Sequence, residues 1–154
     1  YQIGSASIVK KNGVYYLYYF GRYAPDYRIG LATSTDGINF TRFAGNPIIT
    51  NTAGWEGTGV IYPAVIYDNA VFKMIYVNAS GTGFGMATSS DGFNWIKSGN
   101  NPFFTNQNTS NNWAITKIAF PHWLKLQNET RIYYSGIAIN SDQHRIGMMK
   151  RSNN

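Results

Sequence analysis

Carboxylates are the side chains of this chain that are best suited to chemistry, and they are few. Two carboxylates that face each other can act as a general acid and as a base or nucleophile. The seven acidic residues are Asp26, Asp36, Glu56, Asp68, Asp91, Glu129 and Asp142. Asp36 and Asp91 each stand in a Ser-x-Asp-Gly segment, where Asp binds backbone N–H groups of a turn and Gly accepts the left-handed conformation. We therefore predict that these two acids are structural turn residues.

Residues that bind transition metals are also sparse. The sequence has no Cys and two His residues, His122 and His144. Zinc and similar ions need three or four closely placed His, Cys or carboxylate ligands. We therefore predict no metal site and no cofactor.

The turn acids belong to an internal repeat of about 55 residues. Residues 29–40, Ile-Gly-Leu-Ala-Thr-Ser-Thr-Asp-Gly-Ile-Asn-Phe, correspond to residues 84–95, Phe-Gly-Met-Ala-Thr-Ser-Ser-Asp-Gly-Phe-Asn-Trp. Both segments lead to an Asn-Pro pair, at 46–47 and 101–102, and a third copy starts at Ile146 and stops at Asn154. A repeat of this size in a strand-rich chain indicates stacked supersecondary units.

Each repeat offers four short strands. In the second unit these cover 62–67, 71–78, 83–89 and 94–96, where β-branched and aromatic residues alternate with turn signals. We expect Phe40 and Trp95 to begin the fourth strands and to pack between neighbouring units. Four-stranded sheets at this spacing are typical of β-propeller blades. The prediction is an all-β, incomplete β-propeller of about two and three-quarter four-stranded antiparallel blades. It forms a single partial propeller domain over 1–154, with repeats at about 1–50, 58–105 and 116–154.

The order of these motifs resembles a known superfamily. Pro-Ala-Val-Ile-Tyr-Asp-Asn at 63–69, a Tyr-rich strand, the Asp-Gly segment and Asn-Pro are similar to the five-bladed propeller glycosidases, glycoside hydrolase families 32, 43, 68 and 130. The resemblance covers almost the whole chain and implies fewer than three of the five blades. Because an open arc of blades exposes a strand edge and an apolar face, we expect a homodimer or association with the remainder of a longer propeller.

The resemblance also implies where catalytic acids would stand. Glycosidases of this kind carry carboxylates at the start of the innermost strand of each blade, and cleavage generally needs two of them. The matching positions here are Ser5, Tyr62 and Ala119, none of which is acidic. We predict no catalytic residue. Glu56 is the one acid just before an inner strand, and we expect it either to reach a pocket mouth or to be a solvated loop residue.

Six residues are candidates for ligand binding, and most of them have a structural alternative. Aromatic faces can stack on sugars, but Trp55 and Trp113 recur at the repeat period, which also favours packing. Tyr62 either donates a hydrogen bond to a ligand or plugs the channel, and His122 either contacts a sugar or packs within the fold. The full set is Ser5, Trp55, Glu56, Tyr62, Trp113 and His122.

Three functional hypotheses remain. The first is a non-catalytic, carbohydrate-associated module with a glycosidase-like propeller. The second is a glycoside hydrolase whose acids lie in other blades or in a partner subunit, and the third is a structural or assembly protein on the same scaffold.

The net charge of +6 comes from scattered Lys and Arg residues rather than from one basic groove, so we expect no nucleic-acid partner. Apolar runs are too short to span a bilayer, so we expect no membrane association.

Overall fold

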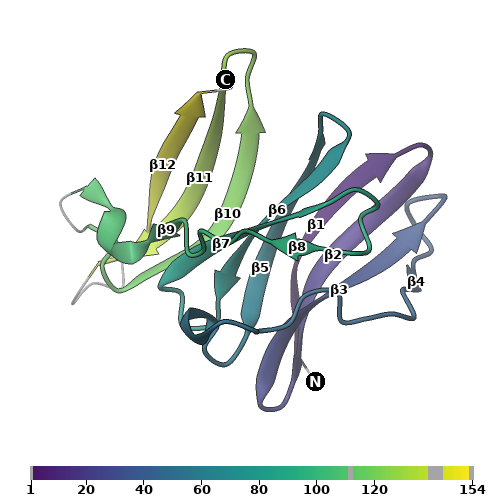
Figure 1. The fold of residues 1–154 in the computed structure, drawn as a ribbon, viewed down its shortest axis with the longest axis horizontal. Helices are drawn as coiled ribbons and strands as arrows, with labels where there is room; N and C mark the ends of the chain where they lie inside the picture. The colour runs from purple at the N-terminus through teal and green to yellow at the C-terminus, as the bar shows by residue number, and fades with distance from the viewer. Residues whose placement is uncertain (1, 111–112, 139–143, 153–154) are drawn as a thin grey trace.

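The fold is built from three antiparallel sheets that open like a fan (Figure 1). The computed structural model describes residues 2–110, 113–138 and 144–152. The N-terminal sheet lies at one side of the fan, the C-terminal sheet at the other, and the sheet of β5–β8 between them. Among the described residues there is no α-helix, so the all-β prediction is confirmed. Within that part of the chain, no helix has the length and apolarity that crossing a bilayer requires.

Sheet one contains four strands in sequential order: β1 (Gln2–Lys11), β2 (Val14–Tyr23), β3 (Asp26–Ser34) and β4 (Thr41–Arg42). The β1–β2 connection is a tight turn, with Asn12 and Gly13 at positive φ values of 49° and 82°. Alternating large residues on β2 place Tyr16, Tyr18 and Phe20 in the core.

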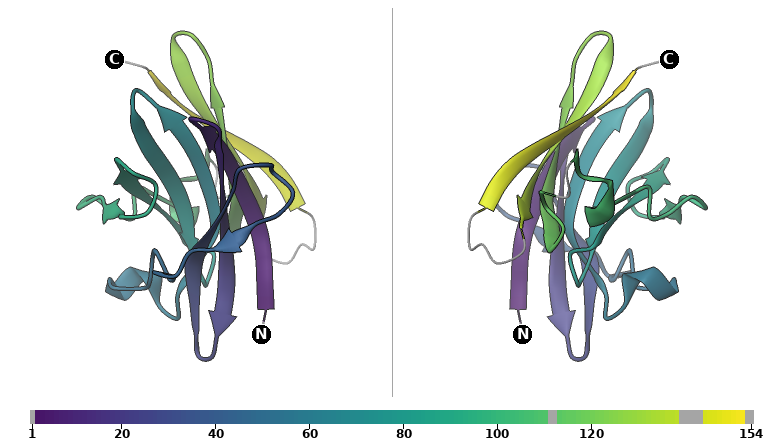
Figure 2. Two further views of the ribbon diagram at one scale, coloured as in Figure 1. Left: turned by 90° about the vertical axis from the view of Figure 1, so that its right-hand side faces the viewer. Right: turned by 90° about the vertical axis from the view of Figure 1, so that its left-hand side faces the viewer.

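Sheet two contains the order β5 (Val60–Asp68), β6 (Val71–Asn78), β7 (Gly83–Ser89) and β8 (Ile96–Lys97). A fifth strand that the sequence did not indicate, β9 (Phe104–Thr105), also pairs with β7. Short 3₁₀ helices, Gly54–Glu56 and Asn106–Asn108, precede the inner strands of sheets two and three. Figure 2 shows the sheets from two sides, with neighbouring long strands antiparallel to one another.

Sheet three contains β10 (Lys117–Lys125), β11 (Glu129–Ile137) and β12 (His144–Ser152). The acidic residue Asp142 and the end of the third repeat at Asn154 lie outside the described residues.

The fourth strands begin later than predicted, because Phe40 and Trp95 precede β4 and β8 instead of opening them. Trp95 nevertheless packs between sheets as predicted. Its ring lies 5.6 Å from that of Tyr18 in sheet one and 6.4 Å from that of Phe72 in sheet two. The core continues along both faces of sheet two, where Phe72, Met74 and Phe84 are fully buried.

The Ser-x-Asp-Gly segments form the predicted turns. Asp36 Oδ1 accepts hydrogen bonds from the backbone N–H groups of Ile38 and Asn39, both at 2.8 Å, and from the Ser34 hydroxyl at 2.7 Å. Asp91 makes the same set of bonds in sheet two. The hydrogen bonds from Asn39 hold the pKa of Asp36 far below its ordinary value, and those from Asn94 do so for Asp91. Both acids are structural, as the sequence predicted.

Candidate functional site

The inner strands β1, β5 and β10 lie side by side, with β5 in the middle, and each is interrupted by a bulge. The bulged residues Ser5, Tyr62 and Phe120 have positive φ values of 41°, 52° and 52°. This shared conformation marks them as equivalent positions, and we call the three the hub. The expectation that Ala119 is the third equivalent is corrected, because the bulge falls on Phe120.

Aromatic rings occupy the hub. The rings of Tyr62 and Phe120 have centroids 4.2 Å apart, and Phe20 meets Tyr62 edge-on at 5.4 Å. Phe120 remains 51% exposed. None of the three hub positions carries a carboxylate, so they offer neither an acid nor a nucleophile for glycosidic cleavage.

Two of the candidate ligand-binding residues, His122 and the hub residue Ser5, lie at or near the surface. Trp123 Nε1 donates to the carbonyl oxygen of Ala64 on β5 at 2.9 Å, so this indole points toward sheet two. Since side chains alternate along a strand, the exposed His122 belongs to the opposite face of sheet three. Ser5 is half-buried on β1.

Glu56 lies neither at a pocket mouth nor in solvent, which corrects both expectations for it. Its exposed fraction is 0%. The carboxylate pairs with Lys97 Nζ at 2.6 Å, accepts the Tyr76 hydroxyl at 2.9 Å, and accepts the N–H groups of Thr52 and Ala53 at 2.7 and 3.0 Å. Burial alone raises the pKa of Glu56, but these hydrogen bonds, led by the one from Lys97, lower it below the ordinary value. Glu56 therefore anchors the segment between sheets one and two.

The two recurrent tryptophans stack on tyrosines of their own sheets. Trp55 lies 5.9 Å from Tyr76 at an interplanar angle of 29°, and Trp113 lies 5.9 Å from Tyr134 at 20°. One face of each indole is therefore covered by protein, and the repetition of the pair reflects the packing role that the sequence left open. Trp55, Glu56 and Trp113 are thus engaged in packing or ion pairing, whereas Ser5 and Tyr62 belong to the hub and His122 lies two residues after Phe120.

Most of the remaining described acids are paired with cations. Asp26 is the first residue of β3 and lies 3.3 Å from Arg28. Glu129 pairs with Arg131. No group of three His, Asp or Glu side chains able to hold a metal ion occurs in the described part of the chain.

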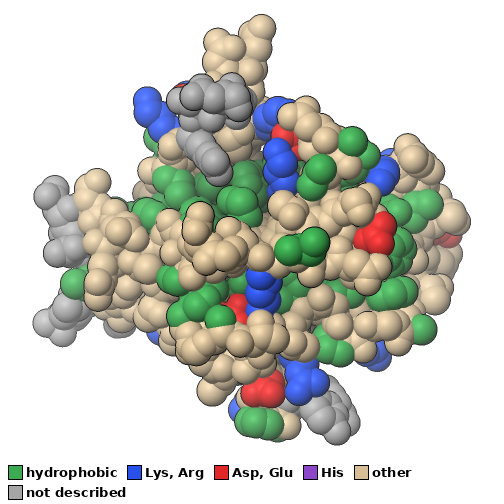
Figure 3. Space-filling view, in the orientation of Figure 1, with side chains coloured by type: hydrophobic (Ala, Val, Ile, Leu, Met, Phe, Trp, Pro, Cys, Tyr) green, Lys and Arg blue, Asp and Glu red, His purple; other side chains and the backbone are tan. Residues whose placement is uncertain are grey.

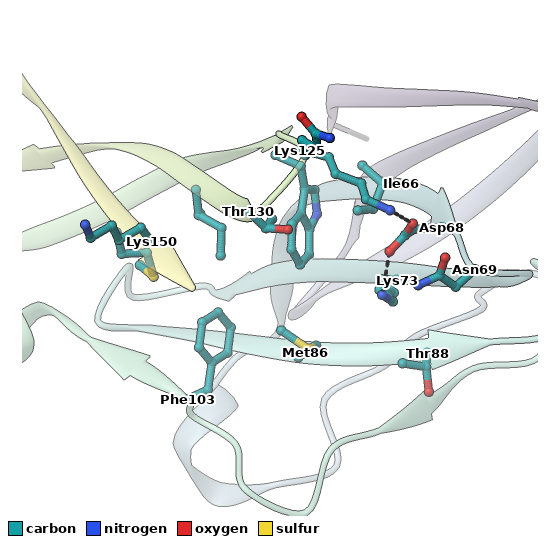
Figure 4. A pocket seen from close by; sticks show the side chains of 14 residues that line it. Ile66, Asp68, Asn69, Lys73, Met86, Thr88, Phe103, Lys125, Thr130 and Lys150 are labelled. Atoms are coloured by element: carbon teal, nitrogen blue, oxygen red, sulfur yellow. Dashed lines mark hydrogen bonds and ion pairs between the residues drawn. The ribbon is translucent and has the colours of Figure 1, made fainter. Parts of the chain in front are cut away.

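A large cavity lies between sheets two and three, where the ends of β5 and β10 face each other (Figure 4). We call it the interblade cavity, and its volume is about 760 Å³. Its apolar lining consists of Ile66, Met86, Phe103, Trp123, Ile132 and Met149. Its polar lining consists of Asp68, Asn69, Lys73, Thr88, Lys125, Gln127, Thr130 and Lys150.

Among the described residues, Asp68 is the one carboxylate that lines this cavity, and it joins the two sheets. It accepts a hydrogen bond from Lys73 of sheet two at 2.8 Å and another from Lys125 of sheet three, as the dashed lines of Figure 4 show. The hydrogen bonds from Lys125 and then Lys73 hold the pKa of Asp68 below its ordinary value. In the described lining this ionised, paired carboxylate has no second acid beside it. The mixed lining can nevertheless bind a polar ligand that also has apolar faces.

The sequence did not reveal this cavity. Asn69 and Gln127 follow the ends of inner strands, but only the approach of sheets two and three brings them to one space with Trp123. The face of the molecule in Figure 3 also combines apolar and charged side chains. Apolar side chains lie in hollows, and most of the few acidic groups lie beside Lys or Arg.

Comparison with known proteins is informative at the level of structure. No protein-family model matches the sequence, and no curated protein matches it. A thermostable family-43 glycoside hydrolase superposes with a TM-score of 0.70 at 16% identity, over 96% of this chain and 50% of that protein. The sucrose-6-phosphate hydrolase from Lactobacillus gasseri gives a TM-score of 0.81 at 11% identity, over 98% of this chain and 32% of that protein. The chain has the fold of a partial glycosidase propeller.

This partial propeller is the predicted fold class. A third structure, the family-32 beta-fructofuranosidase from Bombyx mori, agrees, with a TM-score of 0.71 at 18% identity over 94% of this chain. The chain spans 32–50% of the length of these three proteins. At such identities the likeness concerns the fold, and function must be argued from the site.

Proposed function

We propose that this chain is a non-catalytic, carbohydrate-associated module that binds a glycan in the interblade cavity. One observation carries the proposal: the ends of two inner strands bring the Trp123 indole together with amide, hydroxyl and ammonium groups around one hollow. Sugars present apolar C–H faces and a rim of hydroxyl groups. An aromatic wall with polar groups around it is complementary to both.

The absence of acids at the hub supports a binding role over catalysis. Cleavage of a glycosidic bond generally needs two carboxylates about 5–10 Å apart. The hub positions carry Ser5, Tyr62 and Phe120 instead, and Asp68 is held between two lysines. The alternative, a hydrolase whose acids are supplied by other blades or a partner subunit, is favoured only by the likeness to glycoside hydrolases.

A glycan array followed by titration calorimetry tests the proposal. A glycan that binds should lose about tenfold in affinity in the Gln127→Ala variant, since one hydrogen bond to a sugar hydroxyl is removed. Gln107→Ala is the matched control, because Gln107 is an exposed glutamine in the 3₁₀ helix Asn106–Asn108. Absence of any glycan hit, or equal affinities for both variants, would contradict the proposal.

The hub provides a second location for the same function. There, Ser5, Tyr62 and His122 would make the contacts, with the exposed Phe120 ring as a stacking surface. A loss of glycan affinity in Phe120→Ala with no loss in Gln127→Ala would place the ligand at the hub.

The proposal also includes association of this chain with a second copy or with further propeller blades. Large apolar side chains remain exposed on sheets one and three, among them Ile3, Ile8, Leu124, Ile146 and Met148. We propose that a second copy or further blades cover them. Sedimentation equilibrium distinguishes the two, because a second copy gives a concentration-dependent dimer of this chain alone.

A further inference from the structure

The face of sheet one that points away from sheet two carries a groove of about 430 Å³. Tyr18 and Phe20 point toward sheet two, where they contact Trp95 and Tyr62. Tyr19 stands between them on β2 and therefore belongs to the opposite face. The groove is lined by Gln2, Ile3, Tyr19, Gly21, Arg22, Arg28, Ile29, Gly30, Arg42, Asn46 and Pro47.

The arrangement of residues at the floor of this groove on sheet one recurs in sheet two. Tyr19 pairs with Gly30 across β2 and β3, and Tyr76 pairs with Gly85 across β6 and β7. In both sheets the missing Cβ of the glycine leaves room for the tyrosine ring, since a Cβ on Gly30 would lie 2.9 Å from Tyr19.

The residues at the side of the groove also have equivalents in sheet two. Asn46 donates to the carbonyl oxygen of Leu31 at 2.8 Å and accepts its N–H at 2.8 Å. Asn101 forms the same two bonds to Met86, both at 2.9 Å. Arg42 on β4 holds the register position that Lys97 holds on β8.

In sheet two this place is filled by Trp55 and Glu56. The indole stacks on Tyr76, and the carboxylate binds Lys97 and the Tyr76 hydroxyl. Trp113 covers Tyr134 in sheet three in the same way. Within residues 2–110, 113–138 and 144–152, no aromatic ring stacks on Tyr19.

The groove differs from its counterpart in charge. Arg22, Arg28 and Arg42 line it, and Asp26 forms the ion pair with Arg28 at 3.3 Å. Arg28 Nε is buried, and it has no hydrogen-bond partner among the described residues. Arg28 also stands where sheet two has Gly83, which lies under Trp55, so its guanidinium would lie beside an incoming ring. The groove therefore favours an aromatic occupant that carries negative charge.

We propose that this groove binds a polypeptide segment in which an aromatic residue is followed by an acidic residue, as Trp55 is followed by Glu56. The aromatic ring stacks on Tyr19, and the carboxylate pairs with Arg42 and accepts hydrogen bonds from the guanidinium groups. A second copy of this chain does not supply the segment. Its Trp55 and Glu56 are used within sheet two, and in its other aromatic–acidic pair, Tyr67-Asp68, the carboxylate is already bound by Lys73 and Lys125. Trp113 is followed by Ala114. The occupant is a different polypeptide segment, of the kind that joins one propeller blade to the next.

A labelled synthetic peptide tests the proposal with the intact chain. The probe has the sequence Asn-Thr-Ala-Gly-Trp-Glu-Gly-Thr of residues 51–58, and binding is measured by fluorescence anisotropy. We expect saturable binding with a dissociation constant below about 1 mM. Replacing the peptide Trp by Ala, or its Glu by Gln, should each weaken binding about tenfold.

Protein variants locate the site. Arg42→Ala should weaken binding about tenfold, whereas Arg145→Ala, which removes an exposed cation from sheet three, should leave it unchanged. Three outcomes would overturn the proposal: no saturation, equal losses in the two arginine variants, or displacement of the peptide by an acidic oligosaccharide that itself binds more tightly. The last outcome would assign the groove to an anionic sugar.

Discussion

The Glu56 carboxylate binds the Lys97 ammonium group at 2.6 Å across a sequence separation of 41 residues. Glu56 ends the 3₁₀ helix before β5, and Lys97 ends β8 at the other edge of the same sheet. The pair therefore closes sheet two around the Tyr76 side chain, whose hydroxyl donates to the same carboxylate. Burial and this hydrogen bond raise the pKa of Tyr76 above its ordinary value, so the hydroxyl keeps its proton.

Breaking this pair should destabilise the protein strongly. We expect Glu56→Gln to lower the free energy of unfolding by about 3 kcal/mol, because the Lys97 charge loses its partner in a largely buried place. The double variant Glu56→Gln/Lys97→Met should lose less than the sum of the single variants, as urea unfolding would measure. Asp26→Asn is the control, since the more exposed Asp26–Arg28 pair should contribute at most about 1 kcal/mol. A Glu56→Gln variant as stable as this control would contradict the anchoring role.

Stability should depend on pH through the acids that the fold keeps ionised. Asp36, Glu56, Asp68 and Asp91 all have lowered pKa values. An acid whose pKa is lower folded than unfolded binds protons more readily in the unfolded chain, so its contribution is complete above the unfolded pKa and is lost as pH falls toward the folded one. Urea unfolding should therefore give a nearly constant free energy between about pH 7 and pH 5, and a falling one below about pH 4.

Replacing the turn acids tests the origin of this acid sensitivity. The double variant Asp36→Asn/Asp91→Asn removes two of the groups with lowered pKa, so its unfolding free energy should fall less steeply with acidification. An unchanged slope below pH 4 would show that the turns do not produce the effect.

Substitution of Gly85 should test how tightly the Tyr76 ring is packed. A Cβ at Gly85 would overlap the Tyr76 ring, which cannot move away because Trp55 covers it and Glu56 holds its hydroxyl. Gly85→Ala should therefore cost about 1–3 kcal/mol, measured as a shift of the urea midpoint. Gly99→Ala is the matched control, because nothing lies within 4 Å of its added Cβ. Equal midpoints for the two variants would be inconsistent with the packing described.

Restoring an acid at the hub should not restore hydrolysis. Asp tolerates the positive φ of Tyr62 better than most residues, so we expect Tyr62→Asp to fold. The hub would then hold one carboxylate beside Ser5 and Phe120, and the two-carboxylate reaction would still lack its second group. Release of nitrophenol from a panel of aryl glycosides should stay at the level of the parent chain. Measurable turnover would refute the interpretation that the acid pair is missing.

The sequence by itself determined the fold class and the turns. The strands of sheets one and two follow from alternating aromatic and β-branched residues, and the roles of Asp36 and Asp91 follow from hydrogen bonds to residues two or three positions away. Such local interactions need no knowledge of distant segments. The internal repeat then predicted that the sheets stack on one another, because each copy of the repeat has the same apolar faces to bury.

Only the tertiary structure decided which distant residues meet. The third bulge falls on Phe120 rather than Ala119, since a shift of one residue in a strand depends on how the chain packs against its neighbour. Glu56 is buried because Lys97 and Tyr76 arrive from other strands, and the interblade cavity exists because two sheets diverge beside Trp123. Interactions between residues far apart in sequence depend on the angle and register of whole sheets, which no short stretch of sequence specifies.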